Sequence, residues 1–77
     1  MIDYREEFSW RLDVAMTKRG VSVKDISRKT GIHPKTIYRY LEGHATPNVE
    51  KLVPIAKLLR VKTDWLCGMN AKEDKDA

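Results

Sequence analysis

Seventy-seven residues are enough for one domain with a single hydrophobic core and too few for two. The 15 Lys and Arg residues outnumber the 11 Asp and Glu residues, and the resulting net charge of +4 favours a polyanionic partner. One cysteine excludes an intrachain disulfide and a cysteine-rich zinc site, and the absence of a signal-peptide core or a run of roughly 20 apolar residues predicts a cytoplasmic protein without a membrane segment.

Capping residues and glycines divide the chain into short segments with helical spacing of apolar residues, and strand signals are poor. Asp3 is placed to cap a first helix that ends at Gly20. Ser22 and Asp25 have the spacing of a capping box, which predicts that a second helix begins there. Gly31 can adopt the left-handed conformation that ends this helix.

A third helix is expected from about Pro34 to Glu42, because proline suits the first helical turn and Gly43 would stop the helix. Only two residues separate Gly31 from Pro34, so the second and third helices are joined by a tight turn. Two short helices joined in this way form a helix-turn-helix.

Asn48 is a good cap for a fourth helix, in which Pro54 is an anomaly. Proline has no N–H for the carbonyl of Glu50, so we expect a bend or a delayed start. A short fifth helix is expected from Thr63 to Cys67, within a domain of residues 1–69. Residues 70–77 contain nothing able to join a core, which predicts a disordered charged tail.

The order of these signals over about Phe8 to Gly68 resembles the lambda-repressor-like (Cro/cI, or XRE) helix-turn-helix family. The residues that carry the resemblance are Arg11-Leu12, Gly20-Val21-Ser22, Ile26, Gly31-Ile32, Thr36-Ile37, Arg39-Tyr40, Gly43, Pro47, Leu52, Ile55-Ala56-Lys57, Leu59-Val61 and Asp64-Trp65-Leu66. The resemblance implies an all-α, five-helix DNA-binding domain whose third helix enters the major groove while the second crosses the phosphate backbone. It also implies a sequence-specific transcriptional regulator, a homodimeric repressor of phage, plasmid or prophage type that reads an inverted repeat in double-stranded DNA.

Four residues of the third helix are the expected base contacts by this resemblance: Pro34, Lys35, Tyr38 and Arg39. Lys35 and Arg39 can donate to the guanine edge, and the ring of Pro34 can meet a thymine methyl group. The alternative for the two cations is contact with phosphates alone. Tyr38 can reach a base or a phosphate, or remain in solvent.

Phosphate contacts are expected where the second and third helices begin and in the loop after the third helix. These residues are Ser22, Val23, Lys24, His33, Thr36, His44, Thr46 and Asn48. The segment from Lys18 to Arg39 carries seven cations and one anion, although a run of charge is also typical of a solvated face. Val23 stands where relatives often have a glutamine, and it cannot brace the backbone by a side-chain hydrogen bond.

Two further departures and one interface follow from the same resemblance. Met16 and Leu41 replace an arginine and a glutamate that pair in many relatives, so we expect direct apolar contact between them. Arg60 replaces the glycine that usually ends the fourth helix, which predicts a left-handed residue. The expected dimer interface comprises Val61, Trp65 and Leu66.

An enzyme is the weakest interpretation of this sequence. His33 and His44 have no nucleophile or carboxylate arranged with them, and no glycine-rich phosphate loop exists. We therefore expect no catalytic residue, cofactor, metal or small-molecule effector. Two alternatives to the repressor remain open: an antitoxin-type autoregulator, and a protein-interaction module that keeps the fold without binding DNA.

Overall fold

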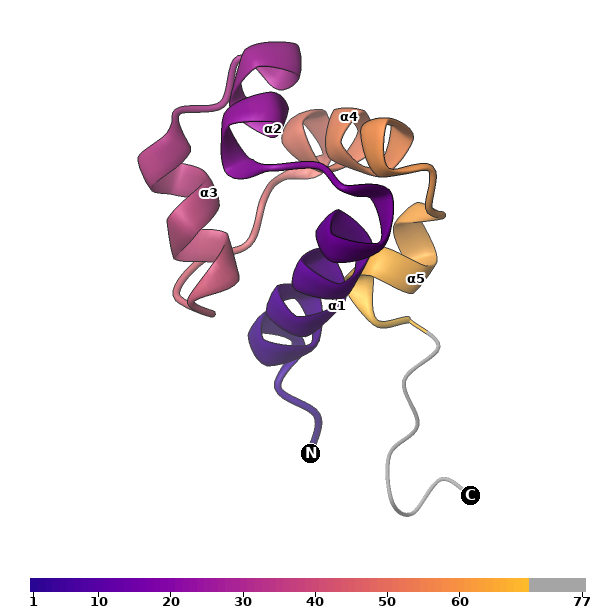
Figure 1. Cartoon of the computed structure of the whole chain (residues 1–77). Coiled ribbons are helices and arrows are strands. Elements are labelled where there is room, and N and C mark those ends of the chain that lie inside the picture. Colours follow the sequence, from indigo (N-terminus) through magenta and orange to yellow (C-terminus); the bar gives the residue numbers. More distant parts are fainter. Residues whose placement is uncertain (70–77) are drawn as a thin grey trace.

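The computed structural model describes residues 1–69, and the predicted tail at 70–77 lies outside the described residues. Within residues 1–69 the chain forms helices and no strands, which confirms the all-α, five-helix prediction (Figure 1). The helices are α1 (Tyr4–Arg19), α2 (Val23–Thr30), α3 (Pro34–Leu41), α4 (Val49–Leu59) and α5 (Thr63–Cys67).

Local side-chain caps determine where the first two helices begin. The carboxylate of Asp3 accepts hydrogen bonds from the backbone N–H groups of Arg5 and Glu6, at 3.0 and 3.4 Å. Ser22 and Asp25 form the predicted capping box, in which each side chain accepts a bond from the other residue's backbone, at 3.1 and 3.0 Å. These bonds satisfy amides that have no partner inside the helix.

α4 begins directly after its cap Asn48 and continues to Leu59, so the expected delayed start at Pro54 is wrong. The missing bond falls on the carbonyl of Glu50, which lies in the exposed first turn, where water can replace the lost donor. A bend alone therefore remains as the predicted consequence of Pro54.

Arg60 has the predicted left-handed conformation, with φ 59° and ψ 43°. It is the one non-glycine residue with positive φ in the described part of the chain. The next amide, that of Val61, donates to the carbonyl of Ala56 at 3.0 Å. This bond closes the C-terminus of α4 in the way that a glycine normally allows.

α1 is the centre of the packing, and it contacts α3, α4 and α5. Phe8 meets Tyr40 of α3 edge to face, with 5.8 Å between ring centroids. Met16 is buried in the core, and Leu41 is half-buried against that same core. Neither side chain is held in solvent, and their direct contact stays a prediction.

Polar side chains of α1 also hold the C-terminal ends of three other helices. The hydroxyl of Ser9 donates to the carbonyl of Leu41 at 2.6 Å, at the end of α3. Arg19 Nε donates to the carbonyl of Leu59 at 3.0 Å, at the end of α4. Arg11 is only 8% exposed and donates to the carbonyl of Trp65 in α5 at 2.9 Å. Carbonyls at helix ends lack intrahelical partners, so these bonds stabilise the arrangement of the helices.

Two kinds of feature are absent from residues 1–69. No helix in that range is long and apolar enough to cross a membrane. No cluster of His, Cys, Asp or Glu side chains in the same range is suited to holding a metal ion.

Candidate nucleic-acid interface

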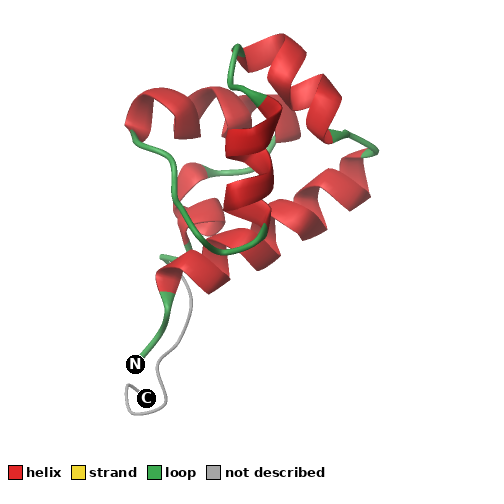
Figure 2. Ribbon diagram, turned by 90° about the vertical axis from the view of Figure 1, so that its left-hand side faces the viewer, coloured by secondary structure: helices red, strands yellow, loops and turns green. Residues whose placement is uncertain are grey.

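α3 has one buried side and one exposed side. Ile37 and Tyr40 are buried in the core, whereas Lys35, Tyr38 and Arg39 lie in solvent. Figure 2, viewed from the side of α3, shows this helix in front of the rest of the molecule. The structure thus presents three of the predicted base-contact side chains on the outer side of one helix.

The turn between α2 and α3 is fixed by a threonine that no motif in the sequence singled out. The hydroxyl of Thr30 donates to the carbonyl of Ile26 at 2.7 Å and accepts from the backbone N–H of Ile32 at 3.2 Å. Gly31 takes the left-handed conformation, with φ 79°, and Ile32 is buried in the core. This one hydroxyl therefore joins the end of α2 to the turn that orients α3.

His33 is the cap of α3, although histidine is not among the residues that cap helices best. Its Nδ1 accepts a hydrogen bond from the backbone N–H of Lys35 at 3.0 Å. The proton of the neutral ring then resides on Nε2, which can donate outward. Pro34 follows as the first residue of the helix and is exposed, while Thr36 in the same turn is half-buried.

The N-terminus of α2 already contains a carboxylate of its own. The backbone N–H of Ser22, and to a smaller extent Arg28, lower the pKa of Asp25. The guanidinium of Arg28 lies 3.0 Å from that carboxylate, so the negative charge of Asp25 is partly neutralised inside α2. Val23 packs its side chain against the core, and Lys24 is exposed. Val23 can therefore meet a phosphate only through its backbone amide, whereas Lys24 can do so through its side chain.

The loop after α3 carries the remaining three predicted phosphate ligands. Thr46 and Asn48 are exposed, and Asn48 Oδ1 accepts a hydrogen bond from the backbone N–H of Lys51 at 3.1 Å. The side-chain NH₂ of Asn48 has donors to spare, because capping uses only the oxygen. Nε2 of His44 lies 3.9 Å from the carboxylate of Glu42, a distance that makes an ion pair only when the ring is protonated.

Four exposed cations of α2 and α3 form no ion pair within residues 1–69: Lys24, Lys29, Lys35 and Arg39. Unpaired side chains of this kind can bind phosphates without first breaking an internal contact. The guanidinium of Arg39 can also donate two parallel hydrogen bonds to a guanine edge. The chemistry of this surface therefore fits an anionic double helix.

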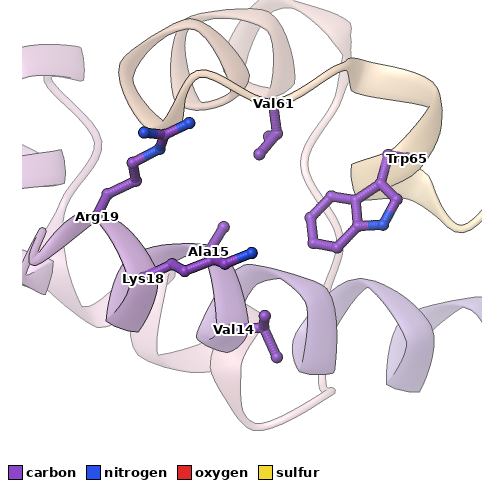
Figure 3. A pocket seen from close by; sticks show the side chains of 6 residues that line it. All are labelled: Val14, Ala15, Lys18, Arg19, Val61 and Trp65. Atoms are coloured by element: carbon purple, nitrogen blue, oxygen red, sulfur yellow. The ribbon is translucent and has the colours of Figure 1, made fainter.

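The residues predicted for a dimer interface do not share one environment. Val61 and Trp65 are half-buried and line a hollow of about 240 Å³ beside α1, as Figure 3 shows. Leu66, in contrast, is 0% exposed. Its assignment to an interface is wrong, because its side chain is buried in the protein's own core.

Comparison with known proteins gave two matches. A family model described as helix-turn-helix matches residues 14–66. A Haemophilus influenzae protein described as an uncharacterized HTH-type transcriptional regulator is 32% identical over 71 residues, which cover 92% of this chain and 29% of the relative. The chain thus spans less than a third of that relative's length. No solved structure matches the chain significantly.

Proposed function

The chain belongs to the helix-turn-helix family, of the lambda-repressor-like type that its sequence resembles, and we propose that it is a sequence-specific DNA-binding transcriptional regulator. The observation that carries this proposal is the outer side of α3, where Lys35 and Arg39 are exposed and form no ion pair within residues 1–69. In the usual docking of a helix-turn-helix this helix lies in the major groove, where such side chains can meet base edges.

Arg39 and Lys35 are proposed as the base readers, through the O6 and N7 acceptors of guanine in the major groove. Pro34 contributes apolar contact at the start of α3, and Tyr38 extends the reading surface. Each good bidentate pair is worth about 1–3 kcal/mol of discrimination between bases.

Phosphate binding is proposed for groups on both sides of α3. Lys24 and the backbone amide of Val23 would hold one phosphate group, while the NH₂ of Asn48 and the side chain of Thr46 would hold another. The hydroxyl oxygen of Ser22 accepts from the amide of Asp25 in the capping box, so its O–H remains able to donate to a phosphate, whereas its backbone amide is engaged by Asp25. His33 and Thr36 are proposed to donate near the start of α3, and His44 from the loop that follows it.

The proposed regulator is a homodimeric repressor that reads an inverted repeat. Two copies of α3 would enter successive major grooves, which requires half-site centres about 34 Å apart on one face of the duplex. Val61 and Trp65 are the residues proposed for the dimer contact.

Selection of bound sequences from a random DNA pool tests this function, because it reports half-site sequence and spacing together. We expect an inverted repeat with half-sites about 10–10.5 base pairs apart, centre to centre. Arg39→Ala should blur the selected sequence. Lys57→Ala is its matched control and should select the same sequence as the wild type, because Lys57 is an exposed cation in the last turn of α4 and not in α3. A pool with no enriched sequence, together with no measurable DNA binding even at low salt, would contradict this function and favour the protein-interaction module.

A further inference from the structure

A second distinctive surface lies on the α5 side of α1. Trp10, one of the two tryptophans in the chain, is 59% exposed there. Val14 and Lys18 follow at intervals of four residues, so the three share one stripe along α1. Val14 and Lys18 also line the hollow, together with Val61 and Trp65 (Figure 3). We call these five residues the α1–α5 face.

The two indoles of this face are held in place by Arg11. Its guanidinium carbon lies 5.9 Å from the ring centroid of Trp10 and 5.2 Å from that of Trp65. Arg11 is itself fixed by Glu7 at 3.1 Å and by its bond to the carbonyl of Trp65. A protruding aromatic ring and a hollow are therefore neighbours on one ordered surface.

This surface is separate from the proposed DNA-binding helix. α3 and α5 both pack on α1 and do not contact one another. In Figure 1 they lie on opposite sides of α1. Covering the α1–α5 face would thus leave α3 accessible.

We propose that the α1–α5 face binds the same face of a second copy, with the two α1 helices antiparallel about a two-fold axis beside Val14. Trp10 and Lys18 each lie four residues from Val14, so this axis brings the indole of one copy to the hollow of the other. The ammonium group of Lys18 then lies within reach of the ring face, in a cation–π contact.

The charge distribution along α1 supports a second copy as the occupant. The first turn of α1 is acidic, with Glu6 and Glu7, and its last turn is basic, with Lys18 and Arg19. An antiparallel pair places the acidic end of each helix near the basic end of the other, and Glu6 lies one turn before Trp10 on the same stripe. Glu7 and Arg19 already bind Arg11 and the carbonyl of Leu59 within the chain, so the charge pairing between copies rests on Glu6 and Lys18.

This inference rests on the proposed homodimer and adds its contact surface on α1. The direct test is cross-linking of Val14→Cys in a Cys67→Ser background, since a two-fold axis beside position 14 brings the two new thiols together. We expect oxidation to convert this variant to a covalent dimer. Lys51→Cys in the same background is the control, because Lys51 lies on the exposed side of α4. Equal cross-linking of both variants would overturn the proposed pairing.

Sedimentation equilibrium gives an independent readout. Trp10→Ala should raise the dimer Kd by about 30-fold or more, as expected for an aromatic hot spot. The matched control is Tyr4→Ala, which removes another half-exposed aromatic from α1 but lies by a different hollow. If Trp65→Ala dissociates the dimer and Trp10→Ala does not, the homodimer stands and the α1 pairing is wrong. A wild-type chain that stays monomeric at its solubility limit overturns both the homodimer and the α1 pairing. The proposal that the chain binds DNA would then still be testable on a single half-site.

Discussion

Arg60→Gly is expected to stabilise the protein, because Arg60 has a backbone conformation that disfavours every residue except glycine. At φ 59° and ψ 43° the Cβ of an L-residue crowds the following carbonyl, at a cost of roughly 1–2 kcal/mol. Glycine removes this strain but adds about 0.4–1 kcal/mol of backbone entropy to the unfolded chain. The net gain is then about 0.5–1 kcal/mol, which raises Tm by roughly 2–8 °C in a domain of this size.

Gly20 provides a matched control at the end of α1. Its φ of 67° and ψ of 34° are close to those of Arg60, and in both turns the next amide donates to the carbonyl five residues earlier at 3.0 Å. A Cβ added at Gly20 would meet no heavy atom within 4 Å. Gly20→Ala therefore introduces the same backbone strain, offset by the same change in unfolded-chain entropy, and should lower the free energy of unfolding by about 0.5–1 kcal/mol.

Thermal unfolding followed by circular dichroism measures both variants, at one fixed protein concentration, because dimerisation makes Tm concentration-dependent. The expected pattern is a higher Tm for Arg60→Gly and a lower Tm for Gly20→Ala. A lower Tm for Arg60→Gly would refute the reasoning, since the arginine side chain would then contribute more than its backbone strain costs.

Three further predictions concern hydrogen bonds and one carboxylate. Thr30→Val leaves the amide of Ile32 without its partner and should reduce stability by about 1–3 kcal/mol in urea unfolding; an unchanged midpoint would contradict this. Ser9→Ala removes the bond to the carbonyl of Leu41 and should reduce the free energy of unfolding by about 1 kcal/mol in the same assay; an unchanged midpoint would show that this bond adds no stability. The folded-state pKa of Asp25 is lowered, so its stabilisation is present above the unfolded pKa and is lost as pH falls through the acid range. Asp25→Asn should therefore lose less stability than the wild type between roughly pH 6 and pH 3, and equal losses would show that Asp25 has no part in the acid response.

The helix starts could be predicted because their causes are local in sequence. Asp3, Ser22 and Asn48 each accept a hydrogen bond from an amide two or three residues later. The left-handed glycines at helix ends follow from the same short-range geometry, whereas the left-handed Arg60 is predicted by the family resemblance and not by a local signal. Local chemistry thus predicted most of the fold.

The missed features depend on tertiary contacts between distant parts of the chain. The partners of Ser9, Arg11 and Arg19 lie 32, 54 and 40 residues away, so no sequence pattern connects them. Leu66 was misassigned because α5 has only five residues, too few for periodicity to separate a buried side from an exposed one. The capping role of His33 has no signal in the sequence, because a lone imidazole does not show which amide it binds.

Fluorescence anisotropy of Arg39→Ala and Lys24→Ala tests the central claim most directly, on the selected DNA site and on mixed-sequence DNA at several salt concentrations. If α3 reads bases, Arg39→Ala weakens binding to the selected site by about 1–3 kcal/mol per half-site and affects mixed-sequence DNA less. Lys24→Ala weakens binding to both DNAs alike and reduces the log-log salt slope by about 0.9 for each phosphate that the variant no longer neutralises. If both variants lower affinity for every sequence by the same factor, Arg39 contacts phosphate alone and the account of base reading by α3 is contradicted.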